Sequence, residues 1–231
     1  MMMAWDEGQT MQARFEHACR AGCGLHAHWR LGDSYGGFAA ALGRRSGELI
    51  SGVVRRFQRQ MRQAAGKHWL CRGWLALAVD GTRIETPHTL ANEAGLGCAG
   101  REKSAPQVFL TALWHLGLGL PWDFRTGPGT DSERRHLETM LADLPAGTLV
   151  VADAGFCGFQ LCRSLLAAGH SFLFRVGGNV TLLTDLGWQV ERRGDLVYLW
   201  PQDFRDQPPL VLRLIVLPRG AQAMYLGPAK E

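Results

Sequence analysis

This 231-residue sequence lacks three features, and each absence excludes a class of protein. It contains no run of about 18 apolar residues, so no membrane-spanning helix is predicted. Its first residues include Asp6 and Glu7 and no apolar segment, so we predict no secretory signal. Its six cysteines are too few for a disulfide framework, and without an export signal we expect reduced thiols in a cytoplasm. Internal repeats and heptads are also missing, which excludes solenoids and coiled coils.

Acidic residues are scarce in the first third of the chain. Residues 1–75 hold 11 Lys and Arg against 5 Asp and Glu, a net charge of +6, whereas residues 76–231 hold 14 against 16, a net charge of −2. We therefore predict a basic, mainly helical segment over residues 1–70. Such a segment either binds an anionic partner, nucleic acid first, or is a solvated arginine-rich helix.

Within this segment a helical pattern begins at Ser46, which can cap a helix, and runs to about Ala65. Arg55, Arg59 and Arg62 recur at i, i+4 and i+7, and this trio is the arginine stripe. Arginine suits phosphate because its planar fork donates two hydrogen bonds and keeps its charge. The opposite face is apolar and is expected to pack; it consists of Ile50, Val53, Val54, Phe57, Met61 and Ala64.

From Trp74 onward, short apolar segments alternate with turn residues. Five strands are predicted at 74–79, 107–115, 120–125, 149–152 and 171–176, with helices at 132–144 and 157–168. This order predicts an α/β core within residues 71–177. Four further strands, at 180–183, 197–200, 210–216 and 224–226, predict an antiparallel β-rich subdomain over residues 178–231.

Asp80 and Asp153 follow the first and fourth predicted strands. In a ribonuclease-H-like mixed sheet these strands are neighbours, so the two carboxylates could meet and hold Mg²⁺, whose preferred ligands are hard oxygens. The alternative is structural: Asp80-Gly81 makes a turn, and Asp153 caps the helix that follows it.

Four stretches resemble one known family. They are AVDGTRIETPHTLANEAGLG (78–97), PQVFLTALWHLGLGLPWDFRTGPG (106–129), LPAGTLVVADAGFCGFQLCRSLLAAGHSFLFRVGGN (144–179) and VYLWP (197–201). They are similar in order and spacing to bacterial DDE transposases of the insertion-sequence-4 type. The resemblance implies a ribonuclease-H-like catalytic domain, interrupted after its fifth strand by a β-rich insertion. It also implies DNA transposition through metal-dependent phosphodiester cleavage and strand transfer.

The resemblance assigns roles to particular residues. It implies that Asp80 and Asp153 are the first two catalytic acids and the ligands of Mg²⁺, with Mn²⁺ as a substitute. Thr82 follows close behind Asp80 and is expected to hydrogen-bond its carboxylate. The implied partners are DNA, at the terminal inverted repeats of a mobile element, and a second copy of the chain in a synaptic complex. The implied location is the bacterial cytoplasm.

One part of the family pattern is not found. The third acid of the family is a glutamate on a helix after the insertion, within a Tyr/Arg/Glu/Lys pattern, and the sequence reaches Glu231 without it. We therefore expect a truncated copy that binds Mg²⁺ weakly and cuts no DNA detectably. Glu133 and Glu138 could approach the site instead. The alternative function is that of a non-catalytic DNA-binding or dimerisation remnant.

A group of histidines and cysteines near the start of the chain has the pattern H-x-C-x3-C-x2-H-x-H. Its members are His17, Cys19, Cys23, His26 and His28. Zinc prefers four nitrogen or sulfur ligands in a tetrahedron, but this spacing fits no standard zinc finger. We therefore do not expect zinc at this group.

Replacing Arg55, Arg59 and Arg62 by alanine tests the arginine stripe. Each phosphate contact that is lost should lower the magnitude of the log–log salt slope by about 0.9 on duplex DNA. Fluorescence anisotropy titrations at several salt concentrations measure the affinity and the slope. A triple variant that matches the parent protein in both would show that the stripe is only solvated.

Overall fold

The structure is a computed structural model that describes residues 3, 6–25, 32, 34–97, 105–176, 188–201, 206, 208–217 and 224–228. The chain divides into two compact units, Met1–Phe57 and Gln58–Glu231. None of the helices in the described ranges combines the length and the apolar character that a membrane crossing requires. The divisions predicted after residues 70 and 177 stay predictions.

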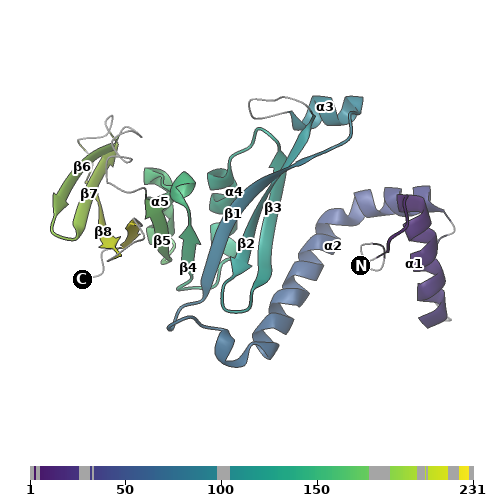
Figure 1. Ribbon diagram of the computed structural model, residues 1–231, viewed down its shortest axis with the longest axis horizontal. Helices are drawn as coiled ribbons and strands as arrows, with labels where there is room; N and C mark the ends of the chain where they lie inside the picture. The colour runs from purple at the N-terminus through teal and green to yellow at the C-terminus, as the bar shows by residue number, and fades with distance from the viewer. Residues whose placement is uncertain are drawn as a thin grey trace. The chain divides into compact units, whose positions relative to one another are not determined.

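The first unit contains α1 (Met11–Leu25) and most of α2 (Tyr35–Ala64), which continues into the second unit (Figure 1). The Thr10 hydroxyl accepts a hydrogen bond from the Ala13 N–H (3.1 Å) at the start of α1. Phe15 is buried and stacks on Phe38, with ring centroids 5.0 Å apart. This aromatic pair joins the two helices within the unit.

The predicted start of the second helix is wrong. α2 begins at Tyr35, after Ser34, whose hydroxyl accepts a hydrogen bond from the Gly37 N–H (3.2 Å). Ser46 lies inside the helix and its hydroxyl donates to the Gly43 carbonyl (3.3 Å). Glycine lowers helix propensity, and several glycines in this part of α2 hid the helical pattern.

Little of the apolar face of α2 is covered by the residues that the structure describes. Ile50, Val53 and Phe57 are exposed, and Met61 alone of the predicted set is buried. The opposite face agrees with prediction, because Arg55, Arg59 and Arg62 are all exposed. The guanidinium of Arg62 lies 5.9 Å from the centroid of the Trp69 ring.

The second unit is built on one nine-stranded mixed sheet with the order β3-β2-β1-β4-β5-β9-β8-β7-β6 (Figure 1). β1 pairs with β4, and β4 with β5, in parallel, and the other neighbours are antiparallel. The strands are β1 (Ala76–Glu85), β2 (Gln107–His115), β3 (Leu120–Pro128), β4 (Leu149–Ala152), β5 (Ser171–Val176), β6 (Trp188–Arg193), β7 (Leu196–Pro201), β8 (Leu210–Val216) and β9 (Met224–Pro228). The helices are α3 (Leu90–Leu96), α4 (Glu133–Met140) and α5 (Phe159–Ala167).

The first five strands have the ribonuclease-H-like arrangement that the sequence predicted: an antiparallel β3-β2-β1 meander followed by parallel β4 and β5. The predicted antiparallel pairing of the later strands is confirmed for β7, β8 and β9. Strand β6 was not predicted, and the predicted strand 180–183 lies outside the described residues. The later strands extend the same sheet, because β9 pairs with β5.

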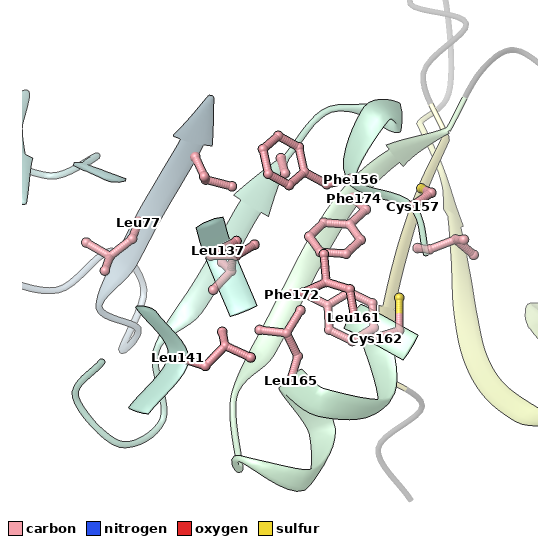
Figure 2. Close-up of a cluster of buried hydrophobic side chains, with 14 of the residues drawn as sticks. Leu77, Leu137, Leu141, Phe156, Cys157, Leu161, Cys162, Leu165, Phe172 and Phe174 are labelled. Carbon is pink, nitrogen blue, oxygen red and sulfur yellow. The ribbon is translucent and has the colours of Figure 1, made fainter. Parts of the chain in front are cut away.

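The core lies between the sheet and the helices α4 and α5 (Figure 2). Leu77 of β1 and Phe172 and Phe174 of β5 are fully buried with Leu137 of α4 and Leu165 of α5. Two cysteines at the start of α5 belong to the same cluster, and burial raises the pKa of the Cys157 thiol to about 11 and that of Cys162 to about 12. Both are packing residues of the core.

Truncating Leu137 to alanine should destabilise the protein by about 2–5 kcal/mol, because it leaves a cavity at a residue with no exposed surface. Chemical denaturation of the variant and the parent protein measures this loss. Leu90→Ala is the matched control, because Leu90 is 90% exposed. Equal losses in the two variants would contradict the placement of Leu137 at the centre of the core.

Candidate functional site

The site depends on the parallel pairing of β1 with β4. The last pair in this ladder is Ala78 with Val151, and continuing its register by two residues brings Asp80 level with Asp153. Paired strands lie about 4.7–4.9 Å apart, so the two aspartates occupy adjacent positions. Both are exposed. The prediction that these two strands are neighbours in the sheet is therefore confirmed.

The prediction that β1 ends at Asp80 is wrong. The strand continues past Asp80 and Gly81 to Glu85, because β2 pairs with it as far as the Glu85–Gln107 pair. The turn that the structural alternative placed at Asp80-Gly81 is therefore excluded as well. Asp80 lies within β1 at the point where the shorter β4 stops beside it.

Asp153 lies directly after β4 and has a second, structural role. Its Oδ1 accepts a hydrogen bond from the Gly155 N–H (2.9 Å) and caps the 3₁₀ turn Ala154–Phe156. The capping alternative is therefore correct for Asp153. It leaves Oδ2 unused by that bond, so capping and ligand binding are compatible. Asp80 Oδ1 similarly accepts a hydrogen bond from the Gly81 N–H (2.8 Å).

Glu133, the first residue of α4, lies against the two glycines that follow the aspartates. A Cβ on Gly81 would be 2.8 Å from Glu133 Oε2, and a Cβ on Gly155 would be 2.9 Å from Glu133 Oε1. Real Cβ atoms essentially never approach so closely, so the Glu133 carboxylate takes its present place because both positions are glycine. The segments that carry Asp80 and Asp153 therefore meet on the carboxylate of Glu133.

The charges of the three acids interact. Burial raises the pKa of Glu133, and the negative charges of Asp153 and then Asp80 raise it further. The positive charges of Arg134 and Arg83 lower the pKa of Glu133. Ionised Glu133 is therefore a source of electrostatic strain in the folded protein.

Glu133 does not complete a three-acid metal site. Side chains alternate between the faces of a strand, so the side chain of Asp80 leaves β1 on the face opposite to the one where Glu133 meets Gly81. Within the described ranges, no three His, Cys, Asp or Glu side chains form a group that could hold a metal ion. Glu138, the other acid that the sequence offered, is exposed further along α4.

A cleft of about 330 Å³ opens on the Glu133 side of β1. Gly81 and Gly155 line it together with Arg83, Glu133 and Arg134. Its entrance therefore adjoins the backbone that carries Asp80 and Asp153. No sequence signal identified Arg83 or Arg134, because they come from different elements and lie far apart along the chain.

The start of α4 is held by a buried chain of hydrogen bonds. His136 Nε2 lies 3.0 Å from Asp131 Oδ2, and His136 Nδ1 lies 2.9 Å from the Thr111 hydroxyl of β2. Hydrogen bonds from the Ser132 N–H and from His136 lower the pKa of Asp131. Ionised Asp131 accepts a hydrogen bond from Nε2–H, and the Thr111 hydroxyl is the hydrogen-bond partner of Nδ1. This chain places Glu133 and Arg134 over the sheet.

Two further predictions, for Thr82 and for the group of histidines and cysteines near the start of the chain, are tested only in part. Thr82 shares the face of β1 with Asp80 and is exposed, but its hydroxyl makes no hydrogen bond to another described residue, so its role stays a prediction. In the zinc candidate, His17 Nδ1 lies 3.0 Å from Asp6 Oδ2. His26 and His28 lie outside the described residues.

The sequence places the chain in a family. A family model described as the transposase DDE domain matches residues 75–216, which include Asp80, Asp153 and the cleft residues. The match covers more than half of the chain, so the chain belongs to the transposase DDE domain family. A search of curated proteins found no match.

Three solved structures are similar in fold. The piggyBac transposase synaptic complex with hairpin DNA has 12% identity and a TM-score of 0.38, over 66% of this chain and 32% of that one. The Mos1 transposase paired-end complex with the left transposon end has 10% identity and a TM-score of 0.31, over 74% and 55%. Ciona intestinalis endonuclease V in complex with a DNA 23mer has 9% identity and a TM-score of 0.30, over 78% and 82%. The chain thus spans about a third of the piggyBac structure.

The environment of Glu133 predicts a pH-dependent gain in stability for Glu133→Gln. A carboxyl with a raised folded-state pKa stabilises the protein below the ordinary value of 4.5, and that contribution is lost as pH rises through the folded-state pKa. Glutamine keeps the shape of the protonated acid. The difference in Tm between variant and parent should therefore be small near about pH 4 and grow toward about pH 8, without metal.

Glu138→Gln is the matched control for this experiment, since Glu138 is exposed on the same helix. Its difference in Tm from the parent should not follow the same pH course. A Glu133→Gln difference that stays constant across the pH range would contradict the electrostatic strain at Glu133.

Proposed function

We propose that this chain acts in DNA transposition, through divalent-cation-dependent phosphodiester cleavage and strand transfer at the ends of a mobile element. The observation that carries the proposal is the level placement of Asp80 and Asp153 on adjacent parallel segments, within the region that matches the transposase family. The four stretches quoted above favour the insertion-sequence-4 type. We further propose the terminal inverted repeats as its DNA and a homodimer as its working form.

The chemistry of the donor set fits Mg²⁺ or Mn²⁺. Mg²⁺ is commonly bound by one or two carboxylates, with water and substrate phosphates completing its coordination. Asp80 and Asp153 supply two such carboxylates, and both are exposed to an incoming strand. When bound, the cation would activate water or a 3′-hydroxyl for attack and stabilise the leaving oxygen.

The protein's own contribution is to position charge. The N–H groups of Gly81 and Gly155 each hold one carboxylate oxygen of the neighbouring aspartate, which orients both side chains before a ligand arrives. Glu133 is a positioning residue in this proposal, because its carboxylate fills the space between the two aspartate-bearing segments. No covalent nucleophile from the protein is required.

Replacing Asp153 by asparagine should weaken Mn²⁺ binding by at least about tenfold, because a hydrogen bond or ligand made by a charged group contributes about 1.5–3 kcal/mol. Asp80→Asn should do the same. Isothermal titration with Mn²⁺ measures the effect, and Glu138→Gln, which changes an exposed acid outside the site, should bind as the parent does.

DNA cleavage is tested on duplexes that carry the sequences flanking the gene in its source DNA. Chains with and without an added family-type C-terminal segment bearing the glutamate are compared, and any cut should disappear in Asp153→Asn. Cleavage that survives this substitution would overturn the proposal. Binding of these duplexes with no cleavage by either chain would instead identify a non-catalytic DNA-binding remnant.

A further inference from the structure

Two arginines that line the cleft each donate a hydrogen bond from Nε to a backbone carbonyl. Arg83 of β1 donates from Nε to the Gly129 carbonyl (2.9 Å) and lies over the Phe109 ring, 4.6 Å from its centroid. Arg134 of α4 donates from Nε to the Gly155 carbonyl (2.7 Å). A backbone hydrogen bond therefore orients each guanidinium group, and for Arg83 the Phe109 ring does so as well.

Within the part of the chain that the structure describes, neither guanidinium takes part in an ion pair. No carboxylate oxygen of the described residues lies within 4.0 Å of a nitrogen of Arg83 or Arg134, although Glu133 lines the same cleft. Their Nη groups likewise make no hydrogen bond to another described residue. By contrast, Arg125 is paired at 3.1 and 2.9 Å with Asp123 and Asp143.

Fixed, unpaired guanidinium groups are suited to one class of ligand. Arginine recognises phosphate by two parallel N–H···O bonds, and a fork that is already oriented loses less entropy on binding. The Nε contacts leave the Nη donors of both side chains available to the cleft. The cleft that both residues line has a volume of about 330 Å³, which is enough to hold a phosphodiester group.

We propose that Arg83 and Arg134 form a phosphodiester-binding pair that grips the DNA backbone next to the scissile phosphate. The inference rests on the proposed function, since it takes the ligand to be the substrate strand. The location supports it, because Gly81 and Gly155 line the cleft and lie next to Asp80 and close after Asp153 along the chain. A strand held in the cleft would lie against the backbone that carries the two aspartates.

The first test measures DNA affinity of the full chain in EDTA, where no metal-dependent cleavage occurs. The probe is a fluorescein-labelled 20-base-pair duplex, and the variants are Arg83→Gln, Arg134→Gln and both together. Each single change should weaken binding about tenfold. Each should also lower the magnitude of the log–log salt slope by about 0.9, and the double variant by about twice as much.

Arg135→Gln is the matched control, because Arg135 is the next residue on α4, has a side chain 77% exposed and does not line the cleft. It should retain nearly all of the affinity. A double variant whose affinity and slope equal those of Arg135→Gln would overturn the proposal.

The second test uses the unmodified protein, so it does not depend on how the variants fold. Phenylglyoxal modifies accessible arginines, and mass spectrometry follows the modification of each one with and without the duplex. DNA should slow the modification of Arg83 and Arg134 more than that of Arg135. Equal protection of all three, or none, would overturn the proposal.

Failure of this inference is distinguishable from failure of the proposed function. If no DNA is cut in the cleavage assay but Arg83 and Arg134 are protected in EDTA, the result supports the phosphodiester-binding pair and contradicts the catalytic function. If DNA is cut in an Asp153-dependent way but neither arginine is protected, the function stands and this pair is excluded.

Discussion

The short parallel ladder between β1 and β4 is the constraint on which the site depends. It pairs only three residues on each strand, yet its register alone places Asp80 level with Asp153. A slip by one residue would move every side chain of β4 to the other face of the sheet. Val150 and Ala152 of β4 are buried, so such a slip would expose apolar side chains, and this cost holds the register.

Close packing around Glu133 makes the positions of the other site residues depend on this register. The carboxylate touches the positions where side chains of Gly81 and Gly155 would lie, so α4, β1 and the segment after β4 converge on one group. The Asp131–His136–Thr111 chain fixes the start of α4 against β2. The shape of the cleft and the positions of its two arginines therefore follow from how the short helix α4 packs on the sheet.

Much of the fold could be predicted because its signals are local. The apolar segments that form β2, β4, β5 and β8 agree closely with the observed strands, and the two core helices lie where the pattern indicated. The errors occurred where a partner decides the outcome. β1 continues to Glu85 because β2 pairs with it there, and the glycine-rich start of α2 is helical against its propensity.

The sequence by itself determined the order of the first five strands and of the helices α4 and α5, the basic character of the first segment, and the two aspartates that follow or interrupt neighbouring strands. Periodicity, turn residues and charge act over a few positions, so they are readable without a structure. Only the tertiary structure decided that Glu133 packs against Gly81 and Gly155, and that Arg83 and Arg134 line one cleft. These arrangements join residues from separate elements, and their positions follow from strand register and helix seating, which no local pattern encodes.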